Sequence, residues 1–196
     1  MPTLARALTA LSFSLAVASV PLSAPLAAKA NKAAPWRPVS AEILMDAQSG
    51  AVLRARNADT LTYPASLTKM MTLFLTFEAL DQGKLRLNQP LPVSRYATTM
   101  QPSRLGLSVG GTITVEEAIL ALVTKSANDV AVVLAEAVAG SEATFAQRMT
   151  ARARALGMKH TAFHNASGLP HRQQRTTARD MAILSRALLT EFPEYR

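Results

Sequence analysis

The sequence of 196 residues contains no cysteine. That absence excludes a disulfide scaffold, a thiolate metal site and a cysteine nucleophile. Aromatic residues are scarce at 5%, and the basic residues behind the formal charge of +8 are scattered along the chain, so the sequence offers no stacking platform for nucleic acid. Charged residues make up 17% and hydrophobic residues 49%, which is typical of a globular chain that buries a sizeable core.

The N-terminal segment has the pattern of an export signal. Arg6 is the only charged residue before Lys29, and the apolar run between them ends in prolines and small residues. We therefore expect residues 1–30 to be a cleaved signal peptide, residues 31–38 to be a linker, and the mature chain to be exported to the periplasm or cell envelope. Its basic character suits an anionic envelope, and peripheral contact with the inner membrane stays open. An uncleaved membrane anchor is the alternative, because the apolar run is almost long enough to cross a bilayer.

The remaining pattern predicts one β-hairpin followed by helices, without the βαβ alternation of a parallel sheet. Turn residues between two apolar stretches indicate the hairpin, while helical spacing, capping residues and terminal glycines mark the helices. The expected strands span 39–45 and 51–55, and the expected helices lie within 64–83, 114–123, 130–138, 141–156 and 177–189. The segment 81–113 shows little periodicity, and we expect no strand there.

The first candidate site is Ser66 with Lys69, three residues apart and just after Pro64. Proline favours a helix entry, so the spacing predicts Ser66 in the first turn of a helix and Lys69 one turn later on the same face. A hydroxyl and an amine placed in this way can act as nucleophile and base, provided that burial lowers the pKa of the lysine. Taken alone, such a pair is more often a helix-capping serine and a surface lysine.

The second candidate site is Ser126 with Asn128, in a polar break between two apolar helical stretches. In a tight turn, a serine and an asparagine two residues apart can point the same way and add a hydroxyl and an amide to a cleft. Alone, the triplet is usually turn chemistry. After Ser66 and Lys69, however, it matches the first two of three signatures of penicillin-interacting serine enzymes.

Six segments carry a wider resemblance. They are MDAQSGAVLRARNAD, PASLTKMMT, GLSVGGTITVEEAI, KSANDVA, FHNASGL and TARDMA, in that order between Val39 and Arg196. In these segments the chain resembles the D-alanyl-D-alanine carboxypeptidases, the low-molecular-weight penicillin-binding proteins. The resemblance implies an α+β fold in which an antiparallel sheet is flanked by helices and a helical subdomain carries the second motif.

The same resemblance implies a role for each candidate residue. Ser66 would attack the peptide carbonyl, Lys69 would be its base, Ser126 would assist proton transfer, and Asn128 would hold the substrate amide. The implied reaction removes the terminal D-alanine from peptidoglycan pentapeptides through an acyl-enzyme, without metal or cofactor, and β-lactams would be covalent inhibitors. A DD-endopeptidase and a β-lactamase-like hydrolase share both motifs and remain alternatives.

The sequence departs from the family at the third signature. It contains no Lys-Thr-Gly or Lys-Ser-Gly triplet, and the resemblance places that strand beyond residue 196. We therefore expect residues 39–196 to be the N-terminal part of the catalytic domain, with the C-terminal strands missing, and residues 31–196 alone to be poorly soluble or molten. Because one lost oxyanion donor costs about 10²–10³ in rate, an inactive truncated remnant is a further alternative.

Two other patterns suggest different catalytic or metal sites. Residues 106–110 fit the G-x-S-x-G elbow around Ser108, and Asp129 and three histidines follow in the order of an α/β-hydrolase. That elbow needs a buried strand before the serine and a helix directly after it, and the sequence predicts neither. The histidines have no carboxylate at metal-ligand spacing, so we expect no zinc site.

Overall fold

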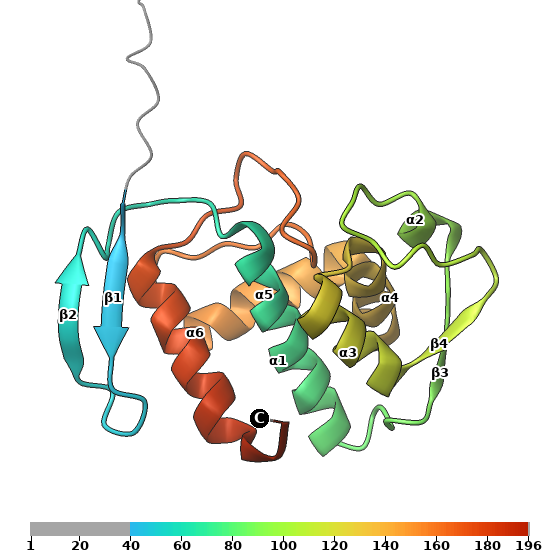
Figure 1. The fold of residues 1–196 in the computed structure, drawn as a ribbon, viewed down its shortest axis with the longest axis horizontal. Helices are drawn as coiled ribbons and strands as arrows, with labels where there is room; N and C mark the ends of the chain where they lie inside the picture. The colour runs from blue at the N-terminus through green and yellow to red at the C-terminus, as the bar shows by residue number, and fades with distance from the viewer. Residues whose placement is uncertain (1–39, 196) are drawn as a thin grey trace, which may run out of the picture. The chain divides into compact units, whose positions relative to one another are not determined.

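A computed structural model of the chain describes residues 40–195. The expected signal peptide, residues 1–30, and the expected linker, residues 31–38, lie outside the described residues. The elements follow in the order β1 (Glu42–Met45), β2 (Val52–Arg56), η1 (Ala65–Leu67), α1 (Thr68–Asp81), β3 (Pro90–Pro92), α2 (Arg95–Thr98), β4 (Thr112–Thr114), α3 (Val115–Lys125), α4 (Asn128–Ala139), α5 (Glu142–Ala155), α6 (Ala178–Glu191) and η2 (Pro193–Tyr195). The fold is α+β, as the family resemblance implied, with two small antiparallel sheets and helices that supply most of the core (Figure 1).

The β1–β2 hairpin forms where alternating apolar residues predicted it, with strands slightly shifted from the expected ones. The strands are antiparallel, Glu42 pairs with Arg56, and the register slips once near the turn. Helix α6 lies beside β1 (Figure 1). Its Arg186 guanidinium donates to the carbonyl oxygens of the turn residues Ala47 and Gln48 at 3.1 and 2.9 Å, so the hairpin turn is tied to this helix.

The core is centred on α4, which contacts α1, α2, α3 and α5. Residues 130–135 of α4 are almost fully buried, because apolar side chains fill this stretch on all sides rather than along one stripe. From α1, Met71 and Phe74 are fully buried in the same core, and Phe74 packs edge-on against Phe192 with ring centroids 5.0 Å apart. Burial therefore fixes α1 and α4, the two helices whose N-terminal ends carry the candidate motifs.

The expectation of no strand in the segment 81–113 is wrong, because a second small sheet begins there. Strands β3 and β4 pair in antiparallel fashion with Leu91 opposite Ile113, and both of these side chains are buried. Helix α2 follows β3 and is capped by Ser94, whose hydroxyl accepts the Ala97 N–H at 3.0 Å. A local reading misses this sheet because β3 has a proline at each end, which is unusual in a strand, and no hairpin turn joins it to β4.

The helix ends follow the capping signals of the sequence. Thr114 caps α3 through a capping box with Glu117, Ser141 caps α5, and Thr177 caps α6. Gly140 ends α4 with a φ of 78°, a left-handed conformation that glycine adopts at little cost. The short break between α3 and α4, where the second candidate motif lies, is formed by Ser126, the C-cap of α3, and Ala127, the N-cap of α4.

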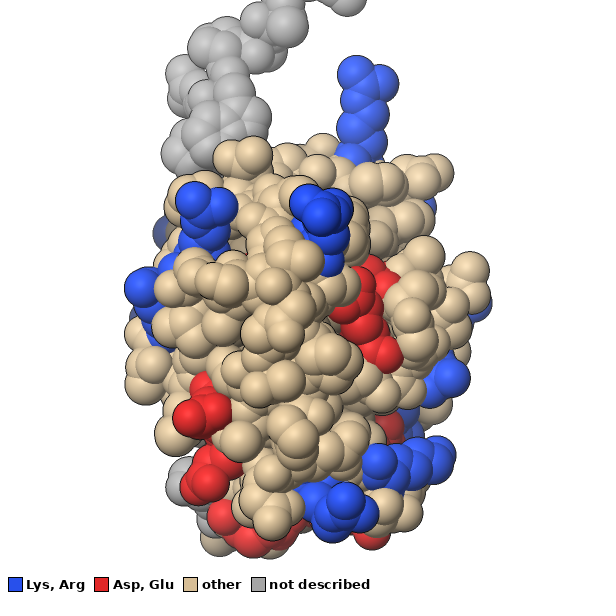
Figure 2. Space-filling model, turned by 90° about the vertical axis from the view of Figure 1, so that its right-hand side faces the viewer, with Lys and Arg blue, Asp and Glu red and all other residues tan. Residues whose placement is uncertain are grey.

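Charged side chains are dispersed over the side of the molecule that carries α2, β3 and β4. Figure 2 shows lysine and arginine side chains there, separated by uncharged surface and by acidic side chains. Within residues 40–195, no helix has both the length and the apolar character needed to span a membrane.

Candidate active site

Ser66 lies in the 3-10 turn η1, which leads directly into α1. The sequence predicted this serine in the first turn of the α-helix itself. The structure differs because Ala65 has a φ of 47°, and a left-handed residue interrupts a continuous helix. The Ser66 side chain is exposed, and its hydroxyl forms no hydrogen bond with the part of the chain that the structure describes. It is therefore open to a substrate.

Lys69 is the second residue of α1, and only 4% of it is exposed. Its Nζ donates to Asn128 Oδ1 at 2.7 Å and to the carbonyl oxygen of Ser167 at 2.6 Å. Burial lowers the pKa of Lys69 from 10.5 to about 8. Both partners are neutral oxygens, so no carboxylate stabilises the charged amine, and roughly a tenth of Lys69 is uncharged at pH 7.

The second motif occupies the break between α3 and α4. Ser126 ends α3 with a φ of 54° and a ψ of 40°, and Ala127 is extended, so the chain changes direction within two residues and Asn128 begins α4. The structure brings Asn128 into contact with Lys69. The Ser126 hydroxyl, by contrast, forms no hydrogen bond with Ser66, Lys69 or any other described residue.

Hydrogen bonds hold Asn128 in one orientation. Its Nδ2 donates to the carbonyl oxygen of Gln101 at 2.8 Å, and its backbone N–H donates to the carbonyl oxygen of Ser103 at 2.7 Å. Because a carbonyl group only accepts, Gln101 selects the amide nitrogen and leaves Oδ1 to face Lys69. The residue that the family resemblance links to the substrate amide is therefore also a partner of the lysine.

The second oxygen at the lysine comes from the FHNASGL segment, residues 163–169, for which the sequence predicts no helix or strand. Thr72 Oγ1 of α1 donates to the carbonyl oxygen of Ala166 at 2.7 Å, and Asn165 Oδ1 accepts the Gly168 N–H at 2.7 Å. These contacts form a tight turn that presents the Ser167 carbonyl. The signal in the sequence was the Asn-Ala-Ser-Gly order, because asparagine and glycine favour such turns.

Gly168 lets this turn approach the nucleophile segment closely. Its φ is 88°, and a Cβ at this position would overlap the carbonyl group of Ala65. Every other residue type has that Cβ, so only glycine fits without a backbone shift. The loop that supplies the Ser167 oxygen is thus packed directly on the residue before Ser66.

The competing serine elbow is not formed. Ser108 lies in an irregular, exposed segment, with neither a strand before it nor a helix directly after it. The Asp129 carboxylate, which would have to orient a histidine, accepts the backbone N–H groups of Leu105, Gly106 and Leu107 at 2.9, 2.8 and 3.3 Å. The α/β-hydrolase interpretation therefore lacks both its nucleophile geometry and its acid.

Two of the histidines pack against each other. The His164 and His171 rings are stacked with centroids 4.3 Å apart, and burial together with the nearby charges of His171 and Arg175 lowers the pKa of His164. Among residues 40–195, no group of three or more histidine, aspartate or glutamate side chains is placed to hold a metal ion.

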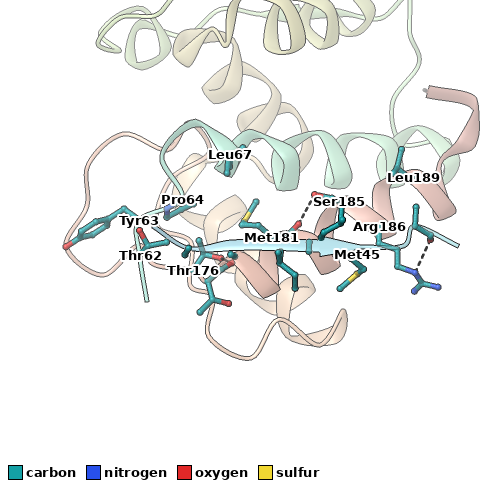
Figure 3. A pocket seen from close by; sticks show the side chains of 17 residues that line it. Met45, Thr62, Tyr63, Pro64, Leu67, Thr176, Met181, Ser185, Arg186 and Leu189 are labelled. Carbon is teal, nitrogen blue, oxygen red and sulfur yellow. Dashed lines mark hydrogen bonds between the residues drawn. The ribbon is translucent and has the colours of Figure 1, made fainter. Parts of the chain in front are cut away.

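A cavity beside the nucleophile segment is mostly apolar and separate from the lysine. It measures about 500 Å³ and lies between β1, α6, residues 62–64 and Leu67. Figure 3 shows Pro64, Leu67 and Met181 around it. Since Lys69 does not line this cavity, its walls offer apolar surface and no acid–base group from the candidate set.

The sequence is similar to a family of known enzymes. A family profile described as D-alanyl-D-alanine carboxypeptidase matches residues 28–195. The D-alanyl-D-alanine carboxypeptidase DacC of Escherichia coli (strain K12) is 39% identical over 174 residues, which cover 86% of this chain and 44% of that protein. The chain spans less than half the length of the curated relatives that it matches.

The fold is similar to solved structures of D-alanyl-D-alanine carboxypeptidases and penicillin-binding proteins. The D-alanyl-D-alanine carboxypeptidase DacD from Francisella tularensis superposes with a TM-score of 0.77 at 33% identity, covering 84% of this chain and 41% of that one. Penicillin-binding protein D2 from Listeria monocytogenes, in its ampicillin-bound form, gives a TM-score of 0.70 at 33% identity, covering 79% of this chain and 62% of the other.

Proposed function

The chain belongs to the D-alanyl-D-alanine carboxypeptidase family, and on that premise we propose that it supplies the serine nucleophile and the lysine base of a DD-peptidase. The reaction removes the terminal D-alanine from peptidoglycan pentapeptides through an acyl-enzyme on Ser66. Its nucleophile and its base are both side chains, so the reaction proceeds without a metal or an organic cofactor.

The environment of Lys69 is the observation that carries this proposal. A neutral lysine amine has two hydrogens and one lone pair. The two hydrogen bonds donated by Nζ use both hydrogens, and the lone pair is then available for the hydroxyl proton of Ser66. A pKa of about 8 is close to the range in which a general base works best near neutral pH.

In the proposed reaction, Ser66 Oγ gives its proton to Lys69 and bonds to the carbonyl carbon of the penultimate D-alanine. The peptide bond then breaks, and the departing amine of the terminal D-alanine takes up a proton, with the Ser126 hydroxyl assisting the transfer. Water attacks the ester on Ser66, which releases the shortened peptide and restores the hydroxyl. Two steps with lower barriers replace one with a high barrier.

The proposed partners follow from the same chemistry. A β-lactam presents a strained amide to Ser66; attack by Oγ breaks the ring C–N bond and leaves the opened drug as an ester on the same oxygen. The similarity to an ampicillin-bound penicillin-binding protein supports this ligand class. We place the reaction in the periplasm or cell envelope, a proposal supported by the export pattern of the N-terminal sequence. Nucleic acid is not among the proposed partners, because the basic residues are scattered and aromatic residues are few.

Covalent labelling with penicillin tests the proposal. The experiment uses the full-length protein that the gene encodes. Mass mapping of peptides should place the adduct on the peptide that contains Ser66, and the adduct should be absent from Ser66→Ala. Labelling that persists in Ser66→Ala but disappears in Ser108→Ala would contradict the proposal and favour the serine elbow instead.

A further inference from the structure

Two buried carboxylates lie close to the site without taking part in the proposed chemistry. Asp129 is 1% exposed and Glu142 is 8% exposed. Acidic side chains are rarely buried unless their oxygens are paired or hydrogen-bonded. Both of these accept backbone N–H groups, and each holds a segment that leads to one of the two oxygens at Lys69.

Asp129 holds the segment that orients Asn128. Its two oxygens accept the N–H groups of three consecutive residues, 105–107. The chain directly before this segment supplies the carbonyl oxygens of Gln101 and Ser103, which bind the side chain and the backbone of Asn128. By fixing this segment, Asp129 keeps the Asn128 amide turned with its oxygen toward the lysine.

Glu142 holds the other segment from the start of α5. Its Oε1 accepts the Ala166 N–H at 2.9 Å, and its Oε2 accepts the Tyr96 hydroxyl at 2.7 Å. Since Thr72 binds the Ala166 carbonyl oxygen, both backbone polar groups of Ala166 are fixed. The next carbonyl along the chain is that of Ser167, which accepts from the lysine.

We propose that Asp129 and Glu142 are positioning residues, each holding the segment that aims one neutral oxygen at Lys69 Nζ and keeps the amine buried. The inference rests on the proposed role of Lys69 as the base. Burial is the sole cause of the lowered pKa of Lys69, and no charged group within the described residues contributes to it. A carboxylate in direct contact would raise that pKa, so remote carboxylates that hold neutral oxygens keep the lysine able to lose its proton.

The contacts predict that replacing each carboxylate by its isosteric amide has opposite effects on the site. In Glu142→Gln, the amide oxygen can keep the Ala166 N–H while the amide nitrogen donates to Tyr96, whose hydroxyl turns to accept. In Asp129→Asn, both oxygen positions face N–H donors, so the amide nitrogen meets a donor in either orientation. Glu142→Gln should therefore preserve the site, and Asp129→Asn should disturb it.

An NMR titration of the lysine Cε–Hε resonances tests the proposal without requiring catalysis. The Lys69 resonance is identified by its loss in Lys69→Met. In the full-length protein that the gene encodes, we expect a midpoint near pH 8 in the wild type and in Glu142→Gln. In Asp129→Asn and Glu142→Ala, loosened segments admit water, and the midpoint should rise by about one unit, which leaves roughly tenfold less neutral lysine at neutral pH.

Asp180 provides the matched control. It is 2% exposed and also holds a loop, accepting the His160 N–H at 2.8 Å and the Thr161 hydroxyl at 2.7 Å. Neither of those residues forms a hydrogen bond with Lys69, Asn128 or Ser167. Asp180→Ala should therefore lower stability and leave the Lys69 midpoint unchanged.

The outcomes separate this proposal from the proposed function. An unchanged midpoint in folded Asp129→Asn and Glu142→Ala, or an equal rise in Asp180→Ala, would overturn the positioning role. If Asp129→Asn fails to fold, the contrast between Glu142→Ala and Glu142→Gln decides. If the Lys69 midpoints are as expected but penicillin does not label Ser66, the positioning role is supported and only the proposed function is contradicted.

Discussion

At the scale of single residues, the burial that lowers the pKa of Lys69 also lowers the stability of the folded chain. Its pKa falls from 10.5 to about 8 on folding, so between these pH values the unfolded chain binds more protons at this residue than the folded chain. Stability therefore rises with pH through this window, and below pH 8 the full cost of burying the amine remains. Such shifted groups gather at functional sites.

Lys69→Met should remove this pH dependence. The free energy of unfolding of the wild-type chain, taken relative to Lys69→Met, should be constant below about pH 8 and increase from there toward pH 10, because only the wild-type lysine titrates in that window. Urea denaturation of the full-length protein at a series of pH values measures this difference. A difference that does not change with pH would mean that Lys69 has an ordinary pKa in the folded chain.

Lys69→Arg should abolish acylation although it keeps the positive charge. Arginine stays protonated in proteins and cannot accept the serine proton, so loss of the base should slow penicillin labelling by about 10²–10⁴. The rate of labelling with a fluorescent penicillin measures the effect. Near-normal labelling would show that Lys69 acts only through its charge.

Which single residues the sequence could reveal depends on how local their signals are. The pairs Ser66–Lys69 and Ser126–Asn128 stand within short motifs, so both could be singled out in advance. Ser167 could not, because it contributes a backbone carbonyl and lies 98 residues from the lysine that it binds. Asp129 stands out in the sequence only as the acid of the serine elbow, since nothing in the sequence indicates that its partners are backbone N–H groups.

At the scale of elements, the site depends on how closely two loops approach the helix ends. Gly168 has a left-handed backbone, and the carbonyl group of Ala65 occupies the place of its missing Cβ. Gly157 has nearly the same φ, 89° against 88°, but no atom lies within 4 Å of the corresponding position. The two glycines therefore separate the cost of the backbone conformation from the cost of the close contact.

Gly157→Ala should cost roughly 1–2 kcal/mol, the strain of a left-handed alanine. Gly168→Ala should cost clearly more and should slow acylation of Ser66, because the loop must withdraw from Ala65 and take the Ser167 oxygen away from the lysine. Urea denaturation and penicillin labelling measure the two effects. Equal losses of stability in the two variants would show that the close contact with Ala65 adds nothing to the cost of Gly168→Ala.

The elements themselves were predictable to the extent that their signals are local. Helix caps such as Thr114 and Thr177 could be read directly, because the capping side chain and the N–H that it accepts lie three residues apart. The β3–β4 sheet could not, because its pairing joins residue 91 to residue 113 through an irregular segment. The turn η1 was read as part of α1, since a left-handed alanine has no signature in the sequence.

At the scale of the whole molecule, apolar surface is covered unevenly. Helix α4 is enclosed by other helices, whereas the hairpin and the nucleophile segment expose large apolar side chains: Leu44 at 56%, Leu53 at 65%, Tyr63 at 66% and Leu67 at 53%. Within residues 40–195, β1 pairs only with β2. A two-stranded hairpin is marginal in water, and an unpaired edge beside exposed apolar residues favours association.

We therefore expect the 196-residue chain, expressed by itself, to bind a hydrophobic dye and to associate as its concentration rises. Leu44→Lys combined with Leu53→Lys should reduce both association and dye binding, since the charges interrupt the exposed apolar surface. Val123→Lys is the control, because Val123 is 65% exposed on α3, away from the hairpin. Sedimentation velocity and dye fluorescence measure these effects. A chain that stays monomeric, binds no dye and melts cooperatively would contradict the expectation, and would mean that the hairpin is stable with its apolar side chains facing water.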